Sequence, residues 1–275
     1  MVNKINFFHS IIIFNFAILL SPINILQNKN FLIYCLFFIL IIGISHGALD
    51  NVKGRKLLNI FKIKNILVFY ILYILLSAST IFFWLIFPNL LLLVFLIIAS
   101  YHFGKEDTVF KIQINGFIKE LLFFFKGSAV IFAPLLFNQE KTVKIFEMLN
   151  FNLFKIVNIS PEILIFVIFL SFISNLILAK KEDLNLKSIL ILDFFSVILL
   201  NYFLEPILAF TIYFCFLHSI RHSISLTFEL DKKIKNGIKK FVIKSLPLTL
   251  ITAILYIISI YFLNNFYELN NAIYK

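Results

Sequence analysis

The sequence predicts an all-α integral membrane protein, built as a polytopic helix bundle. Hydrophobic residues make up 61% of the 275 positions and charged residues only 14%. Soluble domains carry roughly 25% charged residues, and no soluble fold of this length hides so much apolar surface from water. Nine apolar runs follow one another along the chain. We therefore expect about nine transmembrane helices in a single domain over residues 1–275.

Each predicted span comes close to the roughly 20 apolar residues that cross a bilayer core as a helix. The first run lacks the small-residue cleavage site of a signal peptide, so we interpret it as a retained helix. Without it the count of spans would be eight. An alternation of apolar and charged residues in the loop 138–161 predicts an interfacial amphipathic helix. The predicted spans are 10–26, 31–49, 65–87, 90–104, 118–137, 162–180, 187–203, 206–228 and 245–263.

The distribution of basic residues predicts the orientation. Loops on the side of the N-terminus carry 18 of the 25 Lys and Arg residues, and loops on the opposite side carry 5. The positive-inside rule then places the N-terminus in the cytoplasm and the protein in the inner membrane. No basic groove with interleaved aromatic residues accompanies the net charge of +11, so we do not expect nucleic acid as a partner.

Three charged residues stand in the interior of predicted spans, away from their ends. Lys126 and Arg221 are the two basic ones, and Asp193 in the seventh span is a buried acid that we expect to pair with one of them. The two cysteines, Cys35 and Cys215, lie in apolar runs. Two isolated membrane cysteines indicate neither a disulfide framework nor a cysteine-based zinc site.

Four of the five histidines are the main functional signal. His46, His102 and the pair His218 and His222 lie in the C-terminal halves of the second, fourth and eighth spans. Because these spans run in the same direction, the four imidazoles share the cytoplasmic half of the bilayer. The pair at positions i and i+4 faces one side of its helix. An imidazole in hydrocarbon is costly and usually functional, so we predict a metal site made of these four side chains, although a single membrane histidine also serves as a bridge between helices.

The ligand set by itself leaves the metal open, because neutral imidazole suits zinc, copper, iron and nickel. Residues 219–221 between the paired histidines include no glutamate, so the base of an intramembrane zinc protease is missing. A histidine-box di-iron site needs more histidines than this chain has. Two candidate carboxylates stand near the same interface: Asp50, four residues after His46, and Asp107, five after His102. Each is expected either to accept the second N–H of a ligand histidine or to serve as an interfacial charge or helix-end group. Gly47 and Gly104 follow two of the histidines and are expected to allow either close helix approach or substrate access.

Three stretches resemble the bacteriorhodopsin-related (Brp/Blh) family of β-carotene 15,15′-dioxygenases. They are residues 46–50 (His-Gly-Ala-Leu-Asp), residues 101–107 (Tyr-His-Phe-Gly-Lys-Glu-Asp) and residues 216–222 (Phe-Leu-His-Ser-Ile-Arg-His). Lys126-Gly127 and Pro134-Leu135 match a further family segment, with Lys where Arg is more usual. The three stretches occur in order over most of the chain, which makes the resemblance specific.

The resemblance implies a non-haem iron oxygenase that uses Fe(II) and O2 to split β-carotene at its central double bond into two molecules of all-trans-retinal. The family's four iron-ligating histidines carry over to His46, His102, His218 and His222. Retinal as product implies a functional link to a proteorhodopsin-type protein. The alternative is a non-enzymatic membrane protein that uses the same histidines to bind or transport a metal or haem. A transporter needs acidic residues along a path from both faces, and the outer halves of these spans have almost none.

Overall fold

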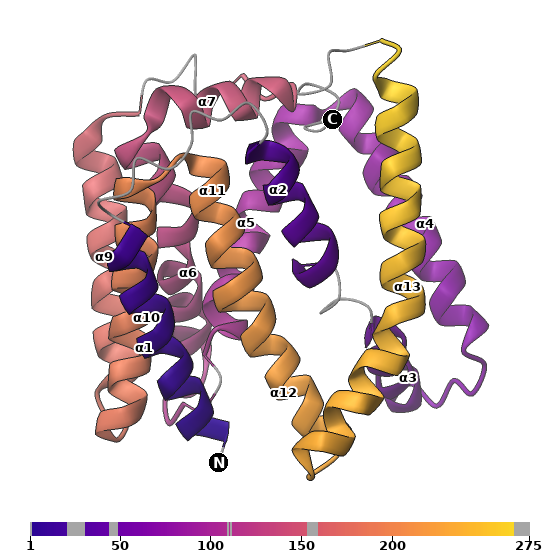
Figure 1. Cartoon of the computed structure of the whole chain (residues 1–275), viewed down its shortest axis with the longest axis horizontal. Coiled ribbons are helices and arrows are strands. Elements are labelled where there is room, and N and C mark those ends of the chain that lie inside the picture. The colour runs from indigo at the N-terminus through magenta and orange to yellow at the C-terminus, as the bar shows by residue number, and fades with distance from the viewer. Residues whose placement is uncertain are drawn as a thin grey trace.

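The computed structural model describes residues 2–20, 31–43, 49–108, 110, 112–152 and 159–266. All regular elements in this part are helices, and eight of them are long and apolar enough to cross a membrane. The fold class expected from the sequence is therefore confirmed. The helices (Figure 1) are α1 (Val2–Leu20), α2 (Phe31–Phe38) with a π-helical continuation (Ile39–Gly43), α3 (Asp50–Ile60), α4 (Leu67–Ile86), α5 (Pro88–Glu106), α6 (Phe117–Phe137), α7 (Gln139–Met148), α9 (Pro161–Ala179), α10 (Leu184–Phe203), α11 (Pro206–Thr211), a π-helical segment (Ile212–Ser219), α12 (Ile220–Leu230) and α13 (Ile234–Leu263).

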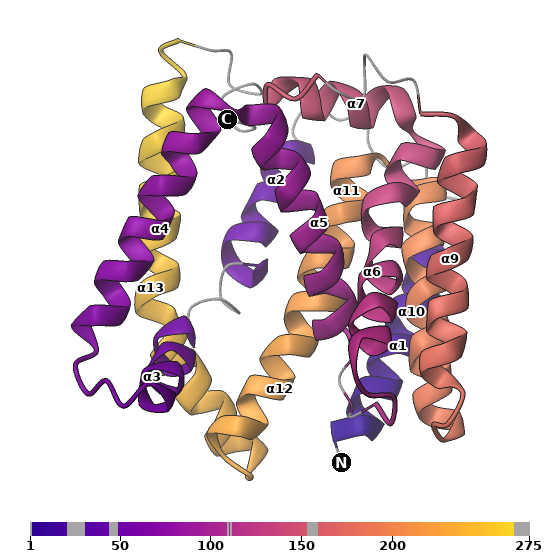
Figure 2. The ribbon, with the colours of Figure 1, turned by 180° about the vertical axis from the view of Figure 1, so that it is seen from behind.

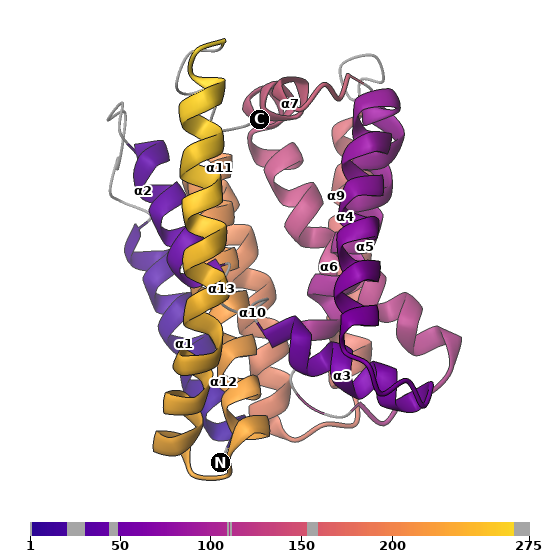
Figure 3. The same ribbon diagram turned by 90° about the vertical axis from the view of Figure 1, so that its right-hand side faces the viewer.

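The helices divide into a packed bundle and two outlying helices. In the bundle, α6 contacts α5, α9 and α10, and α1 packs along α10. The helices α4 and α13 stand away from this group (Figure 2), and Figure 3 shows them apart from each other. Helix α4 buries no residue and α13 buries only Gly237 and Ser245. Apolar side chains that remain exposed along a membrane helix face lipid, so these two helices are built for contact with the bilayer.

The first span differs from its expected position. The sequence predicts 10–26, whereas helix α1 covers Val2–Leu20 and residues 21–30 lie outside the described part. Its polar residues Asn6 and Ser10 are fully buried against the rest of the bundle. Hydropathy missed this part of the helix because its polar face is covered by protein rather than by lipid. The helix is one of the eight candidate spans.

The ninth span also has different bounds, and the second is described only in part. Of the predicted span 31–49, the structure describes an apolar helix over Phe31–Gly43, and residues 44–48 lie outside the described part. The last helix begins at Ile234 rather than at 245. Its additional N-terminal turns are rich in Lys and pack on α12, with Gly237 against the backbone of Thr227. A hydropathy scan does not register such polar turns.

The loop after the fifth span contains the expected short helix, α7. Thr142 is its buried residue, and Phe146 and Leu149 pack with Phe151 against the buried face of α5. Helix α7 lies across one end of the bundle (Figure 1). It is amphipathic as predicted, and its apolar face covers the protein.

Two glycines set the distance between α5 and α6. A Cβ atom built on Gly104 would lie 1.8 Å from the carbonyl oxygen of Phe123, and one built on Gly127 would lie 1.9 Å from that of Ser100. The two backbones therefore touch, and no larger residue fits at either position. The expectation that Gly104 permits close helix approach is confirmed, and this contact fixes where the end of α5 lies.

Candidate metal centre

Three of the four candidate histidines meet in the structure. The segments α2, α5 and α11–α12 run in the same direction through the bundle (Figure 1), as expected from the spans. The ring centroids of His102 on α5 and His218 on the π-helical segment are 5.3 Å apart. Those of His218 and His222 are 6.5 Å apart, and their planes are nearly parallel. His46 lies outside the described residues, so the meeting of all four stays a prediction.

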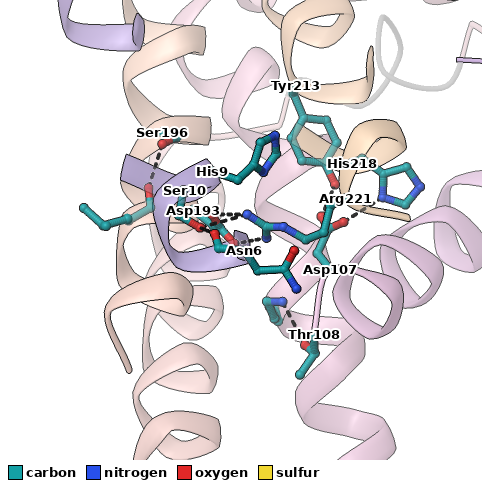
Figure 4. A network of polar contacts seen from close by, with 12 residues as sticks. Asn6, His9, Ser10, Asp107, Thr108, Asp193, Ser196, Tyr213, His218 and Arg221 are labelled. Carbon is teal, nitrogen blue, oxygen red and sulfur yellow. Dashed lines mark hydrogen bonds and ion pairs between the residues drawn. The ribbon is translucent and has the colours of Figure 1, made fainter. Parts of the chain in front are cut away.

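A carboxylate contacts Nδ1 of each of the two histidines on the eighth span. Asp107 Oδ1 lies 2.7 Å from His218 Nδ1, and Glu106 Oε2 lies 3.1 Å from His222 Nδ1. Tyr213 donates its hydroxyl to the other oxygen of Asp107 at 2.6 Å. Figure 4 shows His218 and Tyr213 on either side of the Asp107 carboxylate. Asp107 contacts His218, and not His102, the histidine that precedes it in the sequence.

The charge state of Asp107 follows from its surroundings. Burial by itself would raise the pKa of this carboxyl, but His218, Lys126 and Arg221 stabilise its anion and hold the pKa well below its usual range. The ionised carboxylate accepts hydrogen bonds with both oxygens. It therefore anchors His218 and Tyr213 at the same time.

The second ring nitrogen of His222 contacts a lysine. The ammonium of Lys53 lies 3.3 Å from Nε2 of His222. Lysine has donors only, so this nitrogen presents its lone pair to a positive charge. An imidazole nitrogen that binds a metal ion also presents its lone pair to a positive charge. Nε2 of His222 therefore has the chemistry of a metal ligand.

The spacing of the rings gives a second test of fit. With a metal–nitrogen distance of about 2.1 Å, two imidazoles on one metal keep their centroids within roughly 6.5 Å. The separation between His102 and His218 falls inside this range, and that between His218 and His222 lies at its edge. Among the described side chains, no three His, Cys, Asp or Glu residues approach closely enough to hold a metal by themselves. The donor chemistry of the three imidazoles fits a metal ion, but the described side chains do not close around one, and the fourth predicted ligand, His46, lies outside the described part.

The second candidate carboxylate, Asp50, has a different contact. It accepts a long hydrogen bond of 3.4 Å from the hydroxyl of Tyr73. Burial raises its pKa, and the neighbouring Lys53 opposes that shift. Its predicted partner His46 lies outside the described residues, so its role beside a ligand stays a prediction.

Asp193 pairs with Arg221, which confirms one of the two partners expected for it. Arg221 binds Asp193 through both terminal nitrogens and also donates to Ser10 of α1 at 2.8 Å. All three residues are buried (Figure 4). His9, the one histidine not assigned to the site, approaches the carbonyl oxygen of Phe216 with Nε2 at 2.8 Å. These contacts attach α1 to the helix that carries His218 and His222.

Lys126, the other intramembrane cation, donates hydrogen bonds at the C-terminal end of α5. Its ammonium donates to Thr108 Oγ1 at 2.8 Å and to the carbonyl oxygen of Gly104 at 3.3 Å. A small cavity of about 30 Å³ adjoins it, lined in part by Asp107 and Asp193. Lys126 thus satisfies a helix terminus next to the candidate centre.

Aromatic rings continue from the histidines along the same helix. Phe210, Phe214, His218 and His222 follow one another at intervals of four residues, and each ring is nearly parallel to the next. The centroid distances are 5.3 Å between Phe210 and Phe214 and 5.8 Å between Phe214 and His218. Phe103 meets His218 edge to face at 5.0 Å. We call Phe210 and Phe214 the aromatic ladder. Part of this helix is π-helical, a geometry that occurs frequently at functional sites.

Sequence reasoning missed Glu106, Tyr213 and Lys53. Glu106 stands beside Asp107 and four residues after His102, and this clustering of acids next to a histidine was a usable signal. Tyr213 precedes His218 by five residues on an apolar helix, where a hydroxyl needs a partner. Lys53 is one of several basic residues in a stretch that the sequence predicts as a loop and the structure shows as α3, and it gave no signal of its own.

Comparison with known proteins gives two matches. The family model described as β-carotene 15,15′-dioxygenase matches residues 37–275. A protein named β-carotene 15,15′-dioxygenase, from an uncultured marine bacterium 66A03, is 28% identical over 193 residues, which is 68% of this chain and 66% of that relative. The chain thus matches slightly less than two thirds of the relative's length. No solved structure matches the chain.

Proposed function

The chain belongs to the β-carotene 15,15′-dioxygenase family, and from this premise we propose that it cleaves β-carotene with O2 at the central 15,15′ double bond to give two molecules of all-trans-retinal. One carbon–carbon double bond breaks, and each of its carbons receives one oxygen atom of O2 as an aldehyde carbonyl. The reaction balances without an external reductant. The eight candidate spans support this proposal, because β-carotene dissolves in the bilayer.

Non-haem Fe(II) is the proposed cofactor, bound by His46, His102, His218 and His222. When bound, the iron supplies the activation of O2. The observation that carries this proposal is the approach of His102 and His218, from two different helices, to a ring separation of 5.3 Å, with a carboxylate on Nδ1 of His218. Carboxylate partners of this kind orient metal-binding histidines in proteins.

The remaining tasks belong to side chains that position groups and exclude water. Phe103 and Phe214 cover the ring of His218, which is 1% exposed. Asp107 and Tyr213 hold the same ring in place. In this account no side chain acts as a general acid or base.

The aromatic ladder is the proposed path of the polyene toward the centre. Phe210 and Phe214 are stacked in line with His218, and Phe210 is 37% exposed. A planar conjugated chain packs well on such ring faces and edges. One half of β-carotene would lie along the ladder while its central bond stands beside the histidines.

The test is production of retinal in a bacterial host that accumulates β-carotene. We expect retinal from the parent chain, none from His→Ala variants at 46, 102, 218 and 222, and little change from His9→Gln. Glutamine can still donate to the Phe216 carbonyl that His9 contacts, which makes this variant a matched control. Loss of β-carotene without any retinal would mean that the enzyme cleaves a different bond. No loss of β-carotene from folded, iron-supplied protein would overturn the enzyme, and a Soret band in the purified protein would then favour the haem-binding alternative.

The proposed recipient of the product is a rhodopsin of the proteorhodopsin type in the same membrane. Retinal is apolar and leaves the enzyme into the bilayer, so transfer requires no soluble carrier. Co-expression with a retinal-free opsin should give a coloured pigment that disappears with His218→Ala. The proposed cytoplasmic N-terminus would place the centre in the cytoplasmic half of the bilayer. Reporter fusions at the N-terminus and in the loop between α12 and α13 should both report the cytoplasm.

A further inference from the structure

Two consecutive carboxylates at the end of α5 contact two different histidines of the neighbouring helix. Glu106 ends α5 and Asp107 is its C-terminal cap. Glu106 lies 3.1 Å from His222 Nδ1, and Asp107 lies 2.7 Å from His218 Nδ1. Neither contact connects residues that are close in sequence.

The different lengths of the two acids suit the positions of the two rings. His218 and His222 are one helical turn apart, about 6 Å along the axis. Asp107 reaches the nearer and more deeply buried His218, and the longer glutamate reaches His222. The contact between Gly104 and Gly127 holds the end of α5 against α6. A single helix end thus holds two rings on the facing helix.

The hydrogen-bond partners of His218 and His222 assign the protons on their ring nitrogens. A carboxylate only accepts, so Nδ1 of each histidine carries the proton and donates it. Lys53 only donates, so Nε2 of His222 must accept, which agrees with a proton on Nδ1. Asp107 has a second partner, the hydroxyl of Tyr213 at 2.6 Å, which prevents the carboxylate from turning away.

We propose that Glu106 and Asp107, the latter held by Tyr213, are positioning residues that fix His222 and His218 in the tautomer with the proton on Nδ1 and so present both Nε2 atoms to the iron. The proposal rests on the metal centre of the proposed function. It adds two residues, Glu106 and Tyr213, and assigns a separate acid to each histidine. Removal of such an outer partner typically weakens metal affinity about 10- to 100-fold.

The experiment uses full-length protein in detergent and has two readouts. The first is the affinity for Fe(II), titrated anaerobically against a competing chelator. The second is the ¹⁵N spectrum of histidine-labelled, metal-free protein, in which protonated and unprotonated ring nitrogens are distinct. Assignment uses the single His218→Ala and His222→Ala variants. The second readout requires no iron and no activity.

The variants separate positioning from folding. We expect Glu106→Ala and Asp107→Asn each to weaken Fe(II) affinity about 10- to 100-fold. Glu106→Gln should recover part of the affinity, because its amide oxygen still accepts from Nδ1, and Tyr213→Phe should weaken it by a smaller factor. The matched control is Glu229→Gln, a carboxylate of α12 that makes an exposed ion pair with Lys56, and it should bind Fe(II) like the parent. Glu106 is partly exposed, so its variants should fold even if Asp107→Asn does not.

The possible results distinguish the positioning role of the two acids from the metal centre itself. Nδ1-protonated His218 and His222 in the parent, with the tautomer of His222 altered in Glu106→Ala, would support the positioning role. A parent with the proton on Nε2 of either ring would overturn it, as would unchanged Fe(II) affinity in folded Glu106→Ala and Tyr213→Phe. A parent that binds no Fe(II) would overturn the proposed metal centre instead.

Discussion

The guanidinium of Arg221 and the carboxylate of Asp193 form a buried ion pair between α12 and α10. Both terminal nitrogens of Arg221 contact the carboxylate, and the residues are 0% and 5% exposed. Arg221 also donates a hydrogen bond to the hydroxyl of Ser10 on α1. The residue that precedes His222 in the sequence therefore joins three helices, and the position of His222 depends on that junction.

Removal of one partner of this pair should destabilise the protein. Asp193→Asn leaves a buried guanidinium without its counter-charge, and we expect the free energy of unfolding to fall by about 3–5 kcal/mol. Thermal unfolding in detergent measures the effect. The exposed pair of Lys56 and Glu229 provides the control, because Glu229→Gln should change stability by less than about 1 kcal/mol. Equal melting temperatures for the two variants would contradict the prediction.

Alanine at Gly104 or Gly127 should separate α5 from α6. The added Cβ would overlap a backbone carbonyl of the other helix, and backbone atoms cannot turn aside as a side chain can. We expect either variant to lose most folded protein on size-exclusion chromatography, with a destabilisation above about 4 kcal/mol. Leu121→Ala, on an exposed part of α6, should elute like the parent. Normal yield and Fe(II) binding by Gly104→Ala would show that the helices need not touch.

Removal of a ring from the aromatic ladder should displace the bound polyene more than it slows the cleavage step. In Phe214→Ala the ring stacked on His218 is lost, and such ring contacts contribute about 0.5–1.5 kcal/mol each. We expect a several-fold rise in KM and the appearance of off-centre cleavage products, the longer apocarotenals, in chromatograms. Phe169→Ala, an exposed side chain on α9, a helix that carries no histidine, should give retinal alone. An unchanged product pattern from Phe214→Ala would remove the ladder from the substrate path.

Lys53 should compete with the metal. Its ammonium contacts Nε2 of His222, the atom expected to bind iron, so it must withdraw when the metal binds. Because Lys53 is exposed, this contact is weak, and Lys53→Met should tighten Fe(II) binding by at most about fivefold. Lys56→Met serves as the control for the loss of one charge from α3. Weaker Fe(II) binding by Lys53→Met would instead assign the lysine a supporting role.

Several features followed from the sequence because they depend on local chemistry. The apolar runs predicted the all-α membrane bundle, since transfer of a helix into lipid depends on its own residues. The direction of the spans predicted that His102, His218 and His222 lie at one depth, and the structure brings their rings together. A buried acid in a membrane needs a counter-charge, and this rule predicted the pairing of Asp193 with Arg221.

Tertiary structure alone decided which side chains on different helices face each other. Asp107 was expected near a ligand, but its partner is His218, and Glu106 reaches His222. These contacts depend on the rotation and height of α5 against the facing helix, whereas the contact between Gly104 and Gly127 holds α5 against α6. Likewise, the polar start of α1 is helical because the bundle covers Asn6 and Ser10. The sequence thus determined which segments enter the membrane and which residue types they carry, because lipid acts on each helix separately. The partners of each residue depend on packing between helices, which no single segment encodes.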